Sequence, residues 1–169
     1  MRSVLILFFL SSIIFAQQTE TIQGGSCFQL QIPSYFIKTF ELNEDAILQY
    51  YHPVKDAYWL VIDQDKTMLQ SRGVYFKDVK DYIENLLLDF QKNARNRNLG
   101  AVQLVSSNQD VNIAQSELTL TDNQGKDLVF YIAVIETKDR YYKFYGWTSV
   151  ANKSFLLPEF QSIVQSFKQ

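Results

Sequence analysis

Apolar and polar residues alternate at the start of the globular part of the chain. Residues 28–32 follow this two-residue period and predict a half-buried strand that ends at Pro33. Residues 46–51 and 58–63 predict two further strands, and Pro53 marks the turn between them.

A helical period runs through residues 77–98, where apolar side chains recur at three- and four-residue steps. Asp78 suits the N-terminus of this helix, and Gly100 suits its exit. A second amphipathic helix is expected over 154–167, with Pro158 in its first turn. The stripe of the first helix consists of Val79, Ile83, Leu86, Leu87, Phe90 and Ala94.

Four strands are expected between the two helices, at residues 101–106, 111–121, 128–137 and 141–150. Hairpin signals at 123–126 and 138–140 make the sheet antiparallel. Residues 128–135 are continuously apolar, and both alternating sets of 141–147 contain aromatic rings, as in strands that are covered on both faces. The prediction is an α+β fold: a three-layer α/β/α sandwich with a central, mainly antiparallel sheet of six or seven strands.

The first sixteen residues have the pattern of a signal peptide. Arg2 precedes a short apolar stretch, and Ala16 is a small residue at the expected cleavage position. We expect residues 17–26 to be a flexible lead-in and 27–169 to form a single domain. The chain is then exported, to a periplasmic or extracellular location, with no integral membrane segment after cleavage. Cys27 could be read as a lipidated residue, but Gly24 replaces the aliphatic residue expected three positions before it.

Composition excludes several classes of protein. Of the 169 residues, 47% are hydrophobic and 15% are aromatic, which excludes a disordered chain. Loss of Arg2 with the leader leaves 15 of the 16 basic residues against 18 acidic ones, a net charge of −3 that gives no nucleic-acid footprint. The single cysteine excludes a disulfide framework and a zinc site of several cysteines, and we expect neither a metal nor a cofactor.

Catalytic motifs are missing from the sequence. His52 is the only histidine, and no Gly-x-Ser-x-Gly motif or phosphate-binding glycine loop occurs. Asp63 and Asp65 lack the glycine and glutamate that an EF-hand loop requires. An enzyme would need a polar cluster in a cleft, and His52, Asp63 and Asp65 are its candidates; we expect no catalytic residue. Asn152 begins a glycosylation sequon, which matters only in a eukaryotic host.

Basic residues near the end of the first predicted helix form a possible phosphate site. They are Lys92, Arg95 and Arg97, and the helix dipole explains them equally well. Aromatic residues of two predicted strands form a possible surface for a ligand or a partner, with core packing as the alternative. This candidate surface consists of Tyr58, Trp59, Tyr145 and Trp147.

The order of these elements resembles the PsbP-like family, which includes the extrinsic PsbP subunit of photosystem II and a Ran-binding nuclear import factor. The resemblance covers residues 28–168 and rests on four features. They are Gln31-Ile32-Pro33 after the first strand, Val74-Tyr75-Phe76-Lys77-Asp78-Val79 before the long helix, the paired strands with Phe130-Tyr131-Ile132 and residues 141–147, and the final Ile163-Val164-Gln165-Ser166-Phe167-Lys168. The resemblance implies a non-enzymatic adaptor or accessory role, because characterised members mostly bind proteins; it supplies no catalytic, metal or Ran-contact residue.

Two functions from different classes follow. The first is a protein-interaction or accessory module of an envelope or secreted complex, with an unknown protein partner. The alternative is a domain that binds a small ligand or a lipid in an aromatic-lined pocket. A cavity within the usual range of roughly 300–1,000 Å³ beside the aromatic strands would favour the alternative, and a filled core would remove it.

Overall fold

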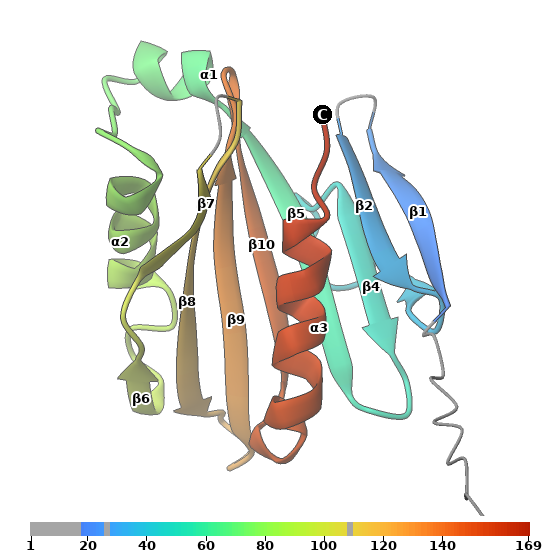
Figure 1. Cartoon of the computed structure of the whole chain (residues 1–169). Helices are drawn as coiled ribbons and strands as arrows, with labels where there is room; N and C mark the ends of the chain where they lie inside the picture. Colours follow the sequence, from blue (N-terminus) through green and yellow to red (C-terminus); the bar gives the residue numbers. More distant parts are fainter. Residues whose placement is uncertain (1–17, 26–27, 108–109) are drawn as a thin grey trace, which may run out of the picture.

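The structure is a computed structural model that describes residues 18–25, 28–107 and 110–169. The predicted signal peptide and Cys27 lie outside the described residues. An eight-stranded sheet forms the centre of the molecule, and every pairing within it is antiparallel (Figure 1). From one edge to the other the order is β3 (Ile37–Lys38), β4 (Leu48–His52), β5 (Ala57–Asp65), β10 (Arg140–Ser149), β9 (Asp127–Glu136), β8 (Asn112–Thr121) and β6 (Arg95–Leu99), with β7 (Gln103–Ser107) also paired to β8.

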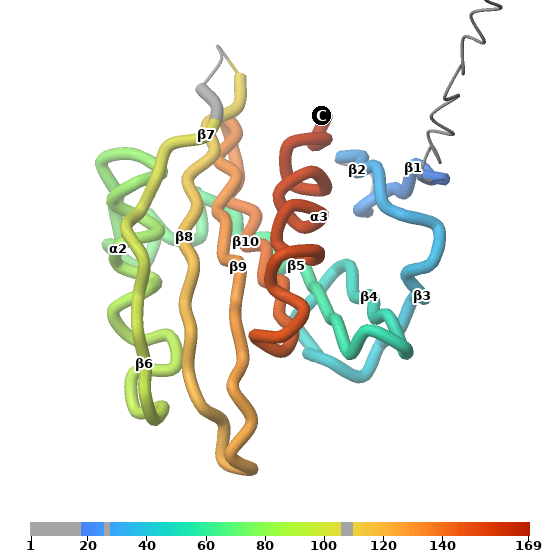
Figure 2. Tube along the Cα trace, turned by 60° about the horizontal axis from the view of Figure 1, so that its bottom comes forward, coloured from blue at the N-terminus to red at the C-terminus, as the bar shows by residue number. Residues whose placement is uncertain are grey.

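Helices cover both faces of this sheet, which confirms the predicted α/β/α sandwich (Figure 2). On one face lie α1 (Lys66–Ser71) and α2 (Val79–Asp89); on the other lies α3 (Lys153–Gln165), which follows the short turn η1 (Val150–Asn152). Each face has its own apolar core. The α3 side includes Ile32, Trp59, Phe144, Phe160 and Ile163, and the α2 side includes Ile83, Leu87, Leu118, Ile132 and Val134.

The N-terminal part forms a separate hairpin beside α3, made of β1 (Thr19–Gly24) and β2 (Phe28–Pro33). The sequence predicted a flexible lead-in where β1 lies, because most of its side chains are polar and exposed; main-chain pairing with β2 orders it without them. The β2 strand itself was predicted correctly. It packs onto the C-terminus, where the ring of Phe28 stacks on Phe167 at 5.1 Å and Gln29 and Lys168 exchange two main-chain hydrogen bonds.

The helix α2 ends nine residues earlier than predicted, at Asp89 instead of residue 98. Phe90 is extended, with φ −63° and ψ 115°, and Gln91 adopts the left-handed region at φ 52°. Arg97 then donates hydrogen bonds to the carbonyl oxygens of Leu87 at 2.6 Å and Phe90 at 3.2 Å, which caps the helix from the strand that follows. Residues 95–98 of the predicted helix therefore belong to β6, and the sheet gains a strand over the predicted six or seven.

The helix α3 lies close against β10. A Cβ added to Gly146 would be 2.7 Å from ring atoms of Phe160, so only glycine permits this approach. The helix itself was predicted correctly, but Pro158 lies inside it and not in its first turn. Within the described ranges no helix is long and apolar enough to cross a membrane.

Candidate functional site

The alternation of side chains along a strand separates the four aromatic residues of the candidate surface. Trp59 points to the α3 side, where it is 0% exposed and stacks between Tyr50 and Phe144 with ring centroids 4.6 and 5.5 Å away. It is a core residue. Tyr145 and Trp147 belong to the α2 side instead, and the ring of Tyr58 stacks on Trp147 at 5.3 Å.

A hollow of about 410 Å³ opens on the α2 side over the strands β5, β10 and β9. Its lining contains no carboxylate and no basic residue, and four of its residues are aromatic. We call this hollow the aromatic groove; its lining residues are Asn43, Leu60, Ile62, Phe90, Gln91, Phe130, Tyr145 and Trp147. Its volume falls within the range of ligand sites, roughly 300–1,000 Å³.

Phe90 closes the aromatic groove on the α2 side. Its ring stacks on Tyr145 at 5.1 Å and meets Phe130 edge-on at 5.5 Å. Trp147 in turn lies 6.0 Å from Phe130 in a stacked arrangement. These rings hold one another in place, so the groove wall is formed without a ligand.

Two local devices keep the aromatic groove open. The helix α2 ends at Asp89 and packs mainly on β8 and β9, so Ile62 of β5 and Trp147 of β10 stay half-buried. On the opposite side the buried amide of Gln49 fixes the segment that carries Asn43. It accepts hydrogen bonds from the main-chain N–H groups of Leu42 and Asn43, at 2.8 and 2.9 Å, and donates one to the Asn43 carbonyl at 2.6 Å.

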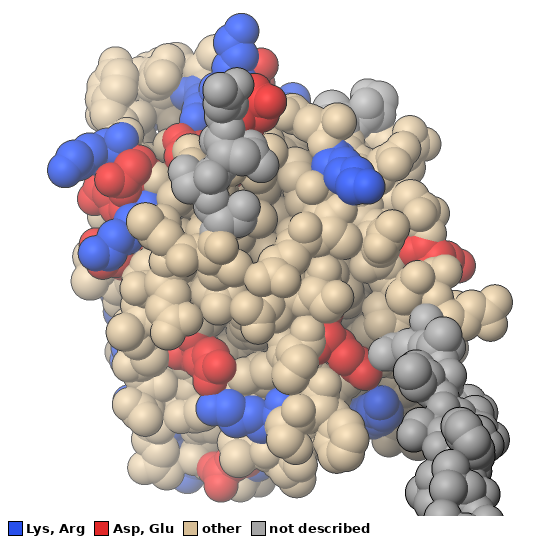
Figure 3. Space-filling view, in the orientation of Figure 1, with Lys and Arg blue, Asp and Glu red and all other residues tan. Residues whose placement is uncertain are grey.

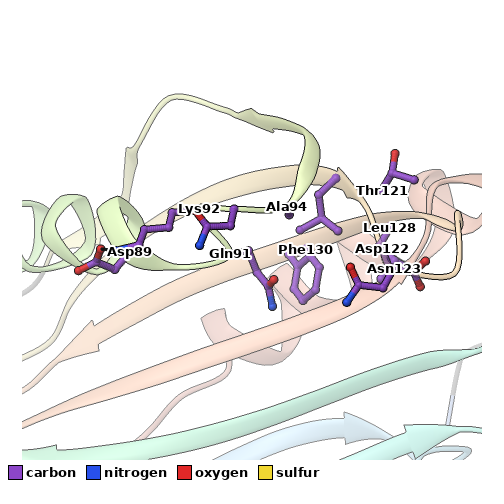
Figure 4. A pocket seen from close by; sticks show the side chains of 11 residues that line it. Asp89, Gln91, Lys92, Ala94, Thr121, Asp122, Asn123, Leu128 and Phe130 are labelled. Carbon is purple, nitrogen blue, oxygen red and sulfur yellow. Dashed lines mark hydrogen bonds and ion pairs between the residues drawn. The ribbon is translucent and has the colours of Figure 1, made fainter.

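Polar hollows adjoin the aromatic groove at both ends. One of about 510 Å³ shares Phe130 and Gln91 with it, and Figure 4 shows the Gln91 side chain beside the Phe130 ring. The other, of about 480 Å³, shares Ile62 and is lined by charged residues that include Lys143 and Arg140.

The possible phosphate site at the end of the predicted helix is not assembled. Lys92 pairs with Asp89 at 2.8 Å, and Arg95 donates to the Asp122 carbonyl at 2.7 Å. Arg97 is committed to the end of α2, as described above. The three cations therefore serve different local partners.

The residues considered for catalysis lie far apart. His52 pairs with Ala57 at one end of β5, whereas Asp63 and Asp65 lie at the other end, about 20 and about 26 Å away at ~3.3 Å per residue. Arg140 pairs with both carboxylates. Across the described residues, no group of three or more His, Cys, Asp and Glu side chains could hold a metal ion.

His52 has a local structural role. Its Nδ1 accepts hydrogen bonds from the main-chain N–H groups of Val54 and Lys55, at 3.2 and 3.4 Å, within the turn after β4. Burial and the neighbouring Lys55 lower the pKa of this imidazole. Asn152, the sequon residue, donates its side-chain N–H to the Lys55 carbonyl at 2.8 Å and so joins the same turn to η1.

Sequence reasoning found Tyr145 and Trp147 but missed most of the groove lining. Strand alternation places Leu60 and Ile62 on the same face of β5 as Tyr58, and Trp59 on the other face. This pattern was available in the sequence. Phe90 was assigned to the helical stripe, and only its extended backbone turns it into a groove wall.

Comparison of the sequence with family models and with characterised proteins finds no match. Solved structures do match. Cyanobacterial PsbP from Synechocystis has a TM-score of 0.61 at 11% identity, with 92% of this chain and 94% of that one covered. LpqN, involved in cell envelope biogenesis of Mycobacterium tuberculosis, has a TM-score of 0.55 at 12% identity, with 89% and 90% covered. A Bacteroides thetaiotaomicron protein has a TM-score of 0.60 at 14% identity, with 90% of this chain but only 48% of that one covered. Identities this low relate folds alone, and by that measure this chain has the PsbP-like fold.

Proposed function

We propose that this chain is an exported, non-enzymatic accessory module that binds a small apolar ligand in the aromatic groove. The observation that carries the proposal is the groove itself, a hollow of about 410 Å³ without a charged lining residue, next to the two aromatic strands. Phe90 and Trp147 are half-buried, so a ligand that covers their rings removes apolar surface from water. Each Å² removed contributes about 25 cal/mol to the free energy of binding.

The non-enzymatic part of the proposal rests on the chemistry of the described residues. The only histidine accepts hydrogen bonds from its own turn, and the nearest carboxylates to the groove along β5 are paired with Arg140. His52 and this pair of carboxylates are therefore already engaged in structural contacts. If the module is a binder, a bound ligand comes back chemically unchanged after prolonged incubation, as mass spectrometry will detect; a converted product overturns this part.

A bulky residue in the groove tests the binding function. The probe is N-phenylnaphthylamine, an uncharged fluorophore whose emission rises in apolar surroundings. We expect saturable binding to the wild type and at least a tenfold weaker affinity for Ile62→Trp, since Ile62 lines the hollow and the larger ring fills it. Val54→Trp is the matched control, because Val54 is 86% exposed on the β4–β5 turn and should leave binding unchanged. Equal affinity in all three proteins would refute the groove as the site.

Export is supported by the leader pattern at residues 1–16 and agrees with the envelope role stated for LpqN. The expected mature chain begins at Gln17. Mass spectrometry of the protein recovered outside the cytoplasm tests this, and recovery of the full chain from the cytoplasm alone contradicts it.

Docking of a protein partner is a second candidate, favoured by the surface on the α3 side. Charged side chains lie around the margin of this face, and uncharged atoms fill its middle (Figure 3); depletion of charge is typical of the core of protein interfaces. Phe155 on α3 is 70% exposed. A photo-crosslinking residue at position 155 should give one discrete adduct in the native cell, whereas one at position 54 should not; no adduct at 155 counts against this function.

A further inference from the structure

Lys143 is the one charged residue that β10 presents on its α2 face. Strand alternation places it between Tyr141 and Tyr145, and it lies opposite Ile62 of β5 and Val134 of β9. It is half-buried, and burial lowers the pKa of its ammonium group although Asp45 and Asp63 act against this. Partial burial of this ammonium group costs free energy unless an anionic group pairs with it.

The second hollow, which we call the charged hollow, is lined by three cations and three carboxylates, and in the part of the chain that the structure describes its ion pairs leave Lys143 without a direct partner. Asp63 and Asp65 are both paired with Arg140. Within the described residues, neither Lys143 nor Arg72 has a carboxylate within 4.0 Å, and Asp45 is the only lining carboxylate outside an ion pair. An incoming carboxylate can therefore pair with Lys143 without breaking an existing ion pair.

The charged hollow and the aromatic groove meet at Ile62, which lines both. Lys143 and Trp147 are four residues apart on β10, about 13 Å at ~3.3 Å per residue. The surface thus offers an uncharged aromatic stretch of this length with an ammonium group at one end. The two hollows have volumes of about 410 and 480 Å³, so each has room for part of one ligand.

We propose that the two hollows together bind an amphipathic carboxylate, with its alkyl or aromatic body along the aromatic groove and its carboxylate at Lys143. This inference rests on the proposed binding function and adds the charge and the orientation of the ligand. A charge-assisted hydrogen bond from Lys143 would fix the head group, while the rings bind the body without directional contacts.

Three probes with the same alkyl chain test the inference: decanoate, decanol and decyltrimethylammonium. Binding is followed by tryptophan emission, because Trp147 lines the groove whereas Trp59 is 0% exposed in the other core. We expect decanoate to bind at least about fivefold more tightly than decanol, the gain of a partly screened ion pair, and decyltrimethylammonium to bind most weakly.

Variants at position 143 separate the charge from the shape. Lys143→Met keeps the length and the apolar stem, so it should lose the preference for decanoate while decanol binds as before. Lys143→Arg should restore the preference. Added salt should weaken decanoate binding to the wild type and leave Lys143→Met unaffected.

The results test the head-group site at Lys143 separately from ligand binding in the aromatic groove. If decanol and decanoate bind equally and Ile62→Trp blocks both, the groove binds ligands but the assigned head-group site is wrong. If Lys143→Met keeps the wild-type preference for decanoate, the inference also falls. If no probe binds, the proposed function and the inference both fall.

Discussion

Removal of one ring tests how α3 is held on the sheet. Phe160 is 0% exposed, its ring centroid lies 6.2 Å from Phe144 and 6.4 Å from Phe36, and Gly146 lies directly beneath it. A fully buried phenylalanine truncated to alanine loses its transfer free energy and leaves a cavity, at a cost of about 3–5 kcal/mol. We therefore expect Phe160→Ala to lower the free energy of unfolding by about 4 kcal/mol.

Equilibrium unfolding in guanidinium chloride measures this loss. With a slope of about 4 kcal/mol per molar, the midpoint should fall by about 1 M, and circular dichroism and tryptophan emission should give the same transition. Phe155→Ala is the matched control, since it is the same change in the same helix at a ring that is 70% exposed. Its effect should stay within about 0.5 kcal/mol.

Two results would refute this reasoning. Equal losses in the two variants would mean that α3 does not use its Phe160 face to cover the sheet. A loss below about 1 kcal/mol for Phe160→Ala would mean that the ring is not enclosed as described.

Three further predictions concern other parts of the fold. Gly146→Ala should cost about 1–3 kcal/mol by overpacking, and in a double-mutant cycle Phe160→Ala should remove most of that cost because the added Cβ lies 2.7 Å from its ring. Arg97→Met should cost about 1–2 kcal/mol and speed amide exchange in the last turn of α2, because two carbonyls lose their cap; unchanged exchange would contradict the capping role. His52 should titrate below the ordinary value of about 6.5 by NMR. A lowered pKa in the folded state means that the contribution of His52 to stability is complete above its unfolded pKa and is lost as the pH falls through its folded pKa. A normal or raised pKa would contradict the half-buried position and the hydrogen bonds that its Nδ1 accepts in the turn.

The sandwich could be predicted because the apolar pattern of a single strand shows whether one or both of its faces are buried. Residues 128–135 of β9 are apolar on both faces, which requires a layer on each side, and the period of α3 supplies one of them. The hairpin signal at Gly125 gave the pairing of β8 with β9. These features depend on neighbours in the chain, so a single sequence carries them.

The end of α2 could not be predicted, because distant residues determine it. Phe90 and Ala94 continue the helical spacing, yet the backbone of Phe90 is extended and its ring stacks on Tyr145 of β10. Arg97 caps the helix only after β6 has paired with β8. The aromatic groove was missed for the same reason, since its existence depends on where α2 stops.

The strand β1 could not be predicted, for a different reason. Its side chains give almost no apolar signal, and its order comes from main-chain hydrogen bonds to β2. In the candidate surface, by contrast, strand alternation alone places Trp59 and Tyr58 on opposite faces of the sheet. Grouping the four aromatic residues into one surface overlooked this.

Intermolecular NOEs from decanoate to the labelled protein show directly where a ligand binds. We expect NOEs from the probe's methylene protons to the rings of Phe90, Tyr145 and Trp147, which line the aromatic groove. We expect none to Phe155, although that ring is more exposed than any of them. Contacts at Phe155 with none in the groove, or no contacts at all under saturating probe, would contradict binding in the aromatic groove.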